Sequence, residues 1–428
     1  EYGLRRLGPC AQAPAHAGIL RALTGEDEGY FTHAAAPFRI GSASSITLRT
    51  ISAAGWIWST IAAICPDRKQ PCSRSPSLTA RRSAPTPSCS SSSSDMALYS
   101  AFFALGLSEE DEVICTAFSY HATAAPLLHF GVKIVFCDVE PDTGNIDTAQ
   151  IEQLITPKTR AIVTNDQWGH PCDKEQVLEL CRRYGLRYVE DCSHAHFAQY
   201  RGRYVGTFGD IACWSLQGRK LLSGGEGGIL LTDDQDLYER AVLLGHNLKR
   251  PAQSVKNEYY RPLDRTGYGL KLRMHPLAAL MIDHELKNYC FSWIESRART
   301  LEYFQSQLQG TFLRPMARRD YVTSMGAWYG FMPRLDPAYK VDREHFIRWM
   351  NDQQLQISIP KSRPIPDYAL FAPDRFPIGH FTKHPVGTYP NAQSYYAQIV
   401  NIPTFTFEEY DRIDRYIEKI HEYERLFL

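Results

Sequence analysis

The sequence predicts an α/β protein in which a mostly parallel sheet lies between layers of helices. From Met96 onward, short apolar runs typical of strands alternate with segments in which apolar residues recur at helical spacing. This alternation is typical of parallel strands joined by crossover helices. Acidic residues such as Asp138 and Asp191 end two of these runs, and loops at the carboxyl ends of parallel strands are where ligands bind.

Each element is expected from the spacing of its apolar residues and from the residues at its ends. A longer helical pattern opens near Pro276 and continues toward Leu308, and the chain finishes in an amphipathic helix over residues 407–426. Residues 247–269 are polar and are expected to form a loop. The remaining helices are expected at 97–107, 122–129, 151–155, 174–184 and 236–244, and the strands at 112–115, 133–139, 161–163, 186–189, 211–214 and 229–231.

With 428 residues, the chain is long enough for more than one domain. We expect an atypical N-terminal segment over residues 1–95, a large domain over 96–285 and a smaller C-terminal α/β domain over 286–428. Residues 66–95 are dominated by Ser, Pro and Arg, so they cannot bury enough apolar area to offset the entropy lost on ordering. This stretch is either a disordered linker or a wrong-frame translation of a GC-rich gene, and the initial Glu1 leaves the true start open.

Composition argues against several classes of partner. Lys plus Arg and Asp plus Glu number 47 each, so no excess of basic charge indicates a nucleic-acid partner, and a small substrate fits better. The eleven cysteines lack the paired spacing of metal sites, and several lie within apolar runs, which favours a reducing, cytoplasmic setting. The apolar stretch 51–65 is too short to span a bilayer, and we expect no signal peptide and no membrane association.

The most informative stretch is residues 215–228, which places Lys220 between an apolar run and a cluster of glycines. The glycines allow the backbone to pack closely against a flat ligand. A lysine that is partly desolvated near a strand end can be unprotonated and form a Schiff base with a carbonyl, as with pyridoxal phosphate. A surface lysine in a flexible glycine loop has the same local pattern, so this motif alone does not decide.

Asp191 lies at the end of an expected strand and precedes Cys-Ser-His-Ala-His. There, a carboxylate can accept a hydrogen bond from a protonated pyridine nitrogen and so maintain the ring as an electron sink. An aspartate at this point can equally cap the next segment. His194 and His196 are residue types that bind zinc, but no cysteine or acidic partner lies at the usual structural spacing, and we expect no metal site.

Three motifs in order, at residues 191–196, 206–210 and 215–228, resemble those of the DegT/DnrJ/EryC1/StrS family of pyridoxal-phosphate sugar aminotransferases. The resemblance implies fold type I of the pyridoxal-phosphate enzymes. The Ser-x-Gln-x-x-Lys and Gly-Glu-Gly-Gly segments look most similar to the branch that aminates keto-cyclitols in aminoglycoside antibiotic pathways. The resemblance extends from about Met96 to the C-terminus and includes Asp-Glu-Val-Ile at 111–114, Arg-Met at 273–274 and Asn-Ile-Pro at 401–403.

The resemblance implies roles for individual residues. Lys220 matches the Schiff-base lysine, and Asp191 matches the aspartate on the pyridine nitrogen. His194 matches the residue that contacts the ring hydroxyl, and Ser215 matches a phosphate ligand. Tyr120 matches the aromatic side chain that stacks on the cofactor ring.

Three positions depart from the family pattern. Ser94 and Asp95 stand where the family has a Gly-Thr pair that binds the phosphate at a helix N-terminus. An aspartate repels a phosphate dianion, so either the backbone amides suffice or the region before Met96 is not native. Lys271 stands where many relatives have an asparagine that reaches the phosphate of the neighbouring subunit, and a lysine could pair with that phosphate instead. Asp166 stands near a position usually held by histidine.

The resemblance implies a ping-pong transamination, in which glutamate or glutamine donates an amino group and a keto-sugar or keto-cyclitol accepts it. Lys220 would be both the covalent anchor of the cofactor and the base that moves the proton. A homodimer with shared active sites is expected, because relatives are typically dimers. Two alternatives stay open: a sugar dehydratase of the same fold, which would have histidine at the lysine position, and a non-catalytic or regulatory cofactor-binding relative. The ketone, the donor and the product stereochemistry are not specified by the sequence.

Overall fold

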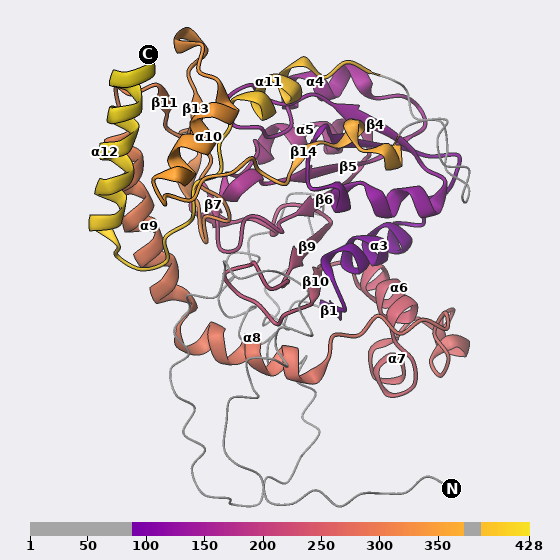
Figure 1. Ribbon diagram of the computed structural model, residues 1–428. Coiled ribbons are helices and arrows are strands. Elements are labelled where there is room, and N and C mark those ends of the chain that lie inside the picture. The colour runs from indigo at the N-terminus through magenta and orange to yellow at the C-terminus, as the bar shows by residue number, and fades with distance from the viewer. Residues whose placement is uncertain (1–87, 372–386) are drawn as a thin grey trace, which may run out of the picture. The chain divides into compact units, whose positions relative to one another are not determined.

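The structure is a computed structural model that describes residues 88–371 and 387–428, which are coloured in Figure 1. Its centre is a seven-stranded sheet in which the five strands from β9 (Ile211–Ser215) to β4 (Lys133–Cys137) are parallel to one another, while β10 (Gly228–Leu231) is antiparallel to both of its neighbours. The predicted mostly parallel α/β sheet is therefore confirmed. The strand order is β1 (Ser88–Ser91), β10, β9, β6 (Arg187–Asp191), β5 (Thr159–Asn165), β2 (Glu112–Thr116) and β4.

Helices surround this sheet (Figure 1). The alternation of buried side chains along β2 indicates that they cover both of its faces. Val113 and Cys115 belong to the core that includes α3 (Ser94–Leu105), whereas Ile114 between them belongs to the core that includes α5 (Lys174–Tyr184). Successive side chains of a strand point to opposite faces, so these two helices lie on opposite sides. The near-continuous apolar run that predicted this strand reflects burial on both faces.

The other helices and the short strands surround this sheet or form the C-terminal part of the chain. Within the described ranges, no helix is both long and apolar enough to cross a membrane. The helices are α4 (Thr148–Ile151), α6 (Gln235–Gly245), α7 (Lys249–Ser254), α8 (Pro276–Asn288), α9 (Cys290–Gln307), α10 (Arg343–Asp352), α11 (Pro390–Gln398) and α12 (Tyr410–Phe427), and the short strands are β3 (Phe118–Ser119), β7 (Gln199–Tyr200), β8 (Arg203–Tyr204), β11 (Leu313–Arg314), β12 (Val322–Ser324), β13 (Arg334–Leu335) and β14 (Arg363–Pro364).

Three predicted elements were wrong in detail. The helix expected at 122–129 is a pair of 3₁₀ turns, because Pro126 has no N–H for an α-helical bond and lies at the start of the second turn. The long helix from Pro276 ends at Asn288, and α9 starts after Tyr289, whose backbone leaves the helical region. The segment 247–269 contains α7, in which Pro251 alone is buried, so no apolar periodicity marks it.

The stretch that composition describes as unable to fold includes β1 and the start of α3. Ser88–Ser91 pair antiparallel with β10, and the side chain of Ser93 accepts the N–H of Met96 at 3.3 Å as a helix cap. A Cβ on Gly228 would lie 2.1 Å from the carbonyl oxygen of Ser93, so the backbone at this junction leaves room for glycine alone at position 228. The expectation was therefore wrong for residues 88–95, and the rest of the N-terminal segment, residues 1–87, lies outside the described residues.

The C-terminal part of the chain has its own dense set of aromatic contacts. The Phe346 ring lies 4.9 Å from that of Tyr423, which joins α10 to α12, and the Phe304 ring of α9 lies 5.8 Å from that of Tyr416. These contacts hold the last helices together, and the division into domains at residues 96 and 286 stays a prediction. The sheet itself already includes β1, before residue 96.

Candidate active site

Lys220 lies in the turn that connects β9 to β10, beyond the carboxyl end of β9. Its N–H donates to the carbonyl of Gln217 at 2.8 Å, and its Nζ lies 3.6 Å from the centre of the Tyr329 ring. Burial lowers the pKa of Lys220 to about 7, against the smaller opposing effect of the Asp191 carboxylate. In a large fraction of the molecules, Lys220 is therefore an unprotonated amine at neutral pH, and the unprotonated amine is the nucleophilic form.

Asp191 is the last residue of β6, and its side chain is buried. Its Oδ1 accepts the N–H of Ser193 at 3.1 Å, and its Oδ2 accepts the hydroxyl of Thr123 at 2.7 Å. Residues 192–198 form turns rather than a helix, so Asp191 is not a helix cap. An ionised carboxylate has about four lone-pair positions, so two such donors leave it able to accept a further one.

His194 lies in a stack of aromatic rings. Its ring centre is 4.1 Å from that of Tyr329, with 20° between the planes, and 5.2 Å from that of Trp168, with 13° between the planes. Burial, and then the nearby charge of Lys220, holds the pKa of His194 well below its ordinary value. The imidazole is therefore neutral at physiological pH, with one ring nitrogen as a donor and the other as an acceptor.

The N-terminus of α3 lies near the Lys220 turn, because Gly228, at the end of that turn, packs against Ser93. The free N–H groups of a helix N-terminus attract anions. Within its first turn, the hydroxyl of Ser94 donates to Asp95 Oδ1 at 3.2 Å. The Asp95 carboxylate thus lies at the end of the helix where the sequence predicts a phosphate.

Electrostatic effects indicate that Tyr120 lies near the same helix end. Burial first, and then the charge of Asp95, raises the pKa of the half-exposed Tyr120, and the same two causes raise the pKa of Glu226. Ser215 is buried at the end of β9. Lys271 is exposed, and the carbonyl of its neighbour Leu272 accepts the N–H of Ser92 at 2.6 Å, just before α3.

Several buried polar atoms around these residues have no hydrogen-bond partner within the described ranges. Buried polar atoms are almost always paired, so a cluster of unpaired ones indicates a position for a polar ligand. Together with a Lys220 amine that titrates near neutral pH, this set fits an aromatic, polar, carbonyl-bearing cofactor. The atoms are His121 Nδ1, Asn165 Oδ1, Gln167 Nε2, Ser193 Oγ, His194 Nδ1 and His196 Nε2.

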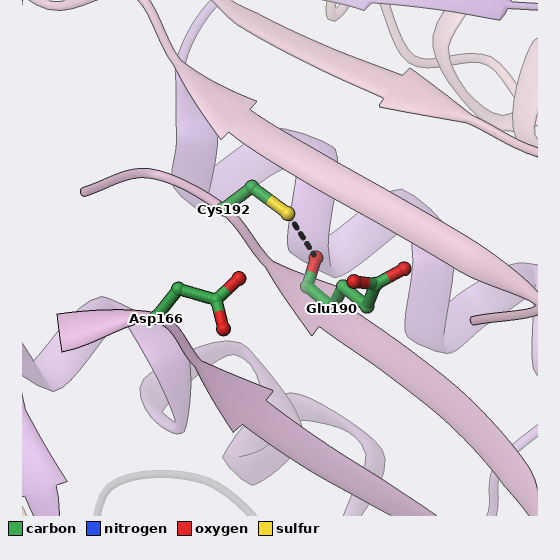
Figure 2. A group of neighbouring side chains, drawn as sticks. All are labelled: Asp166, Glu190 and Cys192. Atoms are coloured by element: carbon green, nitrogen blue, oxygen red, sulfur yellow. Dashed lines mark hydrogen bonds between the residues drawn. The ribbon is translucent and has the colours of Figure 1, made fainter. Parts of the chain in front are cut away.

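A second group of side chains, shown in Figure 2, has the residue types that can bind a metal ion and comprises Asp166, Glu190 and Cys192. Lys174 Nζ lies 2.6 Å from Asp166 Oδ1 and 3.2 Å from Glu190 Oε2, and the side chains of all three residues are almost fully buried. Although burial alone lowers the pKa of Lys174, the neighbouring acidic groups, Asp166 foremost, raise it well above its ordinary value. The lysine ammonium thus already supplies the positive charge that these carboxylates need, and the cluster is an ion pair rather than a metal site.

This ion pair also positions one of the sequence motifs. Glu190 accepts the N–H groups of Gly206, Phe208 and Gly209 at 3.0, 2.8 and 2.7 Å, so it fixes the loop 206–210 against β6. Asp166, which stands near a position usually held by histidine in the family, points to Lys174 within the interior. The presence of aspartate rather than histidine at position 166 therefore affects the buried ion pair with Lys174.

A family model for the DegT/DnrJ/EryC1/StrS aminotransferase family matches residues 86–421. The chain belongs to this family. Aminotransferases of the DegT/DnrJ/EryC1/StrS family depend on pyridoxal phosphate, and one similar solved structure, 25% identical with a TM-score of 0.64, holds a ketimine intermediate. The match begins two residues before β1, so the family includes the strand that composition did not reveal.

Relatives of several activities are similar to this DegT/DnrJ/EryC1/StrS chain. The spore coat polysaccharide biosynthesis protein SpsC of Bacillus subtilis is 28% identical over 334 residues, which are 76% of this chain and 82% of SpsC. GDP-perosamine synthase of Escherichia coli O157:H7 is 39% identical over 181 residues, 42% of this chain and 48% of that protein. A putative L-glutamine:3-amino-2,3-dideoxy-scyllo-inosose aminotransferase of Micromonospora echinospora is 41% identical over 146 residues, 34% of this chain and 35% of that protein. The chain thus spans about half or less of the length of these last two.

Solved structures agree with the fold. An aminotransferase from Psychrobacter cryohalolentis has a TM-score of 0.70 at 24% identity and covers 79% of this chain and 87% of its own. The structure of 3-amino-5-hydroxybenzoic acid synthase has a TM-score of 0.71 at 20% identity, with coverages of 87% and 90%. With the parallel sheet and its helices, these likenesses confirm the fold-type-I architecture of the DegT/DnrJ/EryC1/StrS enzymes.

Sequence reasoning missed several residues at this site. Trp168 has a positive φ of 60° and Tyr329 lies more than 100 residues after Lys220, so neither is part of a local motif. Thr123 falls within the helix expected at 122–129, and Asn165 lies two residues beyond the strand expected at 161–163. The sequence marks Thr123 and Asn165 only as polar residues next to apolar ones. Their role becomes visible when the fold brings them close to Asp191.

Proposed function

We propose that this aminotransferase moves an amino group from glutamate or glutamine to the ketone of a sugar or cyclitol. The observation that carries the proposal is the position of the Lys220 amine, 3.6 Å from the centre of the Tyr329 ring, where burial lowers its pKa to about 7. Such an amine is available at neutral pH both as a nucleophile toward an aldehyde and as a general base.

In this proposal the ring of pyridoxal phosphate is held by four side chains. Lys220 would make the covalent bond, Asp191 would accept a hydrogen bond from the protonated ring nitrogen, and Tyr120 would stack on the ring. His194 would contact the ring hydroxyl through its Nδ1, which has no hydrogen-bond partner among the described residues. When bound, the cofactor supplies an electron sink for negative charge that develops on the substrate carbon.

The phosphate is proposed to bind at the N-terminus of α3 and at Ser215. Backbone N–H groups near Ser94 carry the helix-dipole charge that favours an anion, and Asp95 opposes it. Lys271 is proposed to supply compensating positive charge to the phosphate of a neighbouring subunit. The balance of these charges makes phosphate affinity sensitive to residue 95.

The proton steps are assigned to Lys220 alone. As an unprotonated amine it accepts a proton from the substrate carbon, and as an ammonium it returns that proton to another carbon. Two donors hold the Asp191 carboxylate in place, and the stack of Trp168, His194 and Tyr329 excludes water from one side of the site.

A cyclitol or sugar ketone is proposed as the acceptor from the relatives. One partial relative is a putative scyllo-inosose aminotransferase that uses L-glutamine, and another is GDP-perosamine synthase. The Ser-x-Gln-x-x-Lys segment favours the first, and thus a role in amino-sugar or aminoglycoside-type antibiotic biosynthesis. Eight described cysteines are free and buried, which supports a reducing, cytoplasmic location.

A homodimer is proposed from an exposed apolar row on α8. Leu277, Leu280 and Met281 are each more than half exposed, on a helix whose other face packs into the core. Exposed apolar side chains clustered in this way mark an interface. We expect Leu280→Glu, exposed by 62%, to convert a dimer into a monomer in sedimentation, whereas Leu426→Glu, exposed by 59% on α12, leaves the dimer intact. Equal behaviour of the two variants would contradict this interface.

The half-reaction tests the proposed function. Holoenzyme is mixed with each amino acid, and the visible band of the bound cofactor is followed before keto-cyclitols and keto-sugars are added. We expect glutamate or glutamine to bleach the band and a ketone to restore it. A band that no amino acid bleaches would favour the regulatory alternative, and the presence of Lys220 already argues against a dehydratase.

A further inference from the structure

Asp191 is one end of a chain of buried hydrogen bonds that returns to the neighbouring strand. Thr123 Oγ1 lies 2.7 Å from Asp191 Oδ2, Ser119 Oγ lies 2.9 Å from Thr123 Oγ1, and Asn165 Nδ2 lies 3.1 Å from Ser119 Oγ. Thr123, Ser119 and Asn165 are each no more than 2% exposed. Asn165 is also the cross-strand neighbour of Asp191 in the register of β5 and β6, so both side chains project from the same face of the sheet.

The chemistry of the groups gives this chain one direction. An ionised carboxylate only accepts, so Thr123 must donate its single hydroxyl proton to Asp191. The contact between Thr123 and Ser119 then needs a proton from Ser119. Ser119 Oγ in turn accepts the N–H of Asn165, and the four groups are aligned as donor to acceptor toward Asp191.

The orientation of the Asn165 amide follows from the same assignment of donors and acceptors. If its oxygen faced Ser119, the Ser119 proton would go to Asn165, and the two hydroxyl oxygens 2.9 Å apart would share no proton. With nitrogen toward Ser119, the second N–H of the amide also meets Gln167 Oε1. This orientation therefore satisfies every contact in the chain.

We propose that Asn165, Ser119 and Thr123 form a directional relay whose function is to hold the Asp191 carboxylate in the orientation that would face the ring nitrogen of the cofactor. The inference rests on the proposed function only for the identity of the ring, and these three are positioning residues rather than catalytic residues. Aligned donors polarise one another, so the last bond, from Thr123, is stronger than an isolated hydroxyl bond.

The relay matters for the electron sink. Charge on Asp191 favours a proton on the ring nitrogen, and a protonated ring stabilises negative charge at the substrate carbon. Removing the Thr123 hydroxyl takes away the hydrogen bond that orients the carboxylate, so the ring nitrogen would lose its aligned acceptor and would be protonated less often. The hydrogen bond from Thr123 to Asp191 therefore influences how strongly the ring withdraws electrons. The relay does this without contacting the substrate.

The test uses holoenzyme loaded with cofactor that carries ¹⁵N at the ring nitrogen. Thr123→Val keeps the shape of the side chain and removes the hydroxyl, Thr123→Ser keeps the hydroxyl, and Ser119→Ala removes the middle of the relay. We expect the ¹⁵N resonance of Thr123→Val to move from the protonated toward the unprotonated position, Ser119→Ala to move part of the way, and Thr123→Ser to match the wild type. With a working donor and ketone, kcat of Thr123→Val is expected to fall roughly 10- to 100-fold, the size expected for one hydrogen bond to a charged group, while KM stays nearly unchanged.

An unshifted resonance in Thr123→Val, or an equal shift in Thr123→Ser, would overturn the relay. The resonance needs no turnover, so this readout is independent of whether the proposed donor and acceptor are correct. Wild-type protein that binds cofactor but aminates no ketone would sink the proposed function and leave the relay measurable. Ser119→Ala keeps the test open if Thr123→Val does not fold.

Discussion

The titration of Lys220 is the most quantitative consequence of the site. Burial beside the Tyr329 ring lowers the pKa of Lys220 from 10.5 to about 7. At pH 8 an amine with this pKa is about 90% unprotonated, whereas an ordinary lysine is about 0.3% unprotonated, so the reactive fraction differs by about 300-fold. We therefore expect the covalent bond between protein and pyridoxal phosphate to form fast at neutral pH.

The assay mixes cofactor-free protein with excess pyridoxal phosphate across pH 5 to 11 and follows the rate of the visible band. Below the midpoint the rate is expected to rise about tenfold per pH unit, and above about pH 7 to level off. Borohydride reduction followed by peptide mapping should locate the bond at Lys220. A rate that keeps rising to about pH 10 would refute a desolvated lysine at this position.

Two variants sharpen that result. In Asp191→Asn the midpoint should move to lower pH, because the Asp191 charge raises the pKa of Lys220. In cofactor-free protein, the unfolded lysine holds a proton that the folded one lacks between about pH 7 and 10.5, so wild-type stability should rise with pH across that window. Lys220→Met removes this rise in stability with pH. The free energy of unfolding of the variant should exceed that of the wild type by the largest amount below pH 7.

The other predictions concern packing and charge. Lys174→Met leaves two buried carboxylates without their cation and should cost about 3 to 5 kcal/mol in urea unfolding, whereas Arg182→Ala, in an exposed pair, should cost less than about 1 kcal/mol; equal costs would contradict the buried pair. Gly228→Ala puts a Cβ 2.1 Å from a backbone oxygen and should weaken cofactor binding, while Gly218→Ala, whose nearest atom is 3.7 Å away, should bind normally. Asp95→Thr should bind pyridoxal phosphate roughly 3- to 10-fold more tightly at low salt, and an unchanged Kd would mean that Asp95 does not face the phosphate.

Much of the fold could be predicted because its signals are local. Apolar runs of β2, β5 and β6 and the amphipathic spacing of α5 appear directly in the sequence, and the expected bounds of α5 agree with the structure. Strand β1 escaped notice because its stability comes from backbone pairing with β10 and from small side chains. Composition reports apolar burial and says nothing about such pairing.

Only part of the candidate site could be predicted from the sequence, for a related reason. Lys220, Asp191 and His194 lie in motifs that a short window contains, whereas Tyr329 and Thr123 reach them through tertiary contacts. The sequence pattern did not reveal that the Asp166 side chain pairs with Lys174, because the two residues meet only in the folded interior. Residue type and spacing thus identified the chemistry, and the fold decided which polar side chains take part.

The most direct test of Lys220 as the centre of this site is a single-turnover transfer with ¹⁵N-labelled glutamate or glutamine and a keto-cyclitol or keto-sugar. Wild-type protein and Lys220→Met, each loaded with pyridoxal phosphate, are compared for the appearance of ¹⁵N in the acceptor. We predict transfer by the wild type and at least a roughly thousandfold slower transfer by Lys220→Met, since both the nucleophile and the base are lost. Equal rates in the two proteins would contradict it.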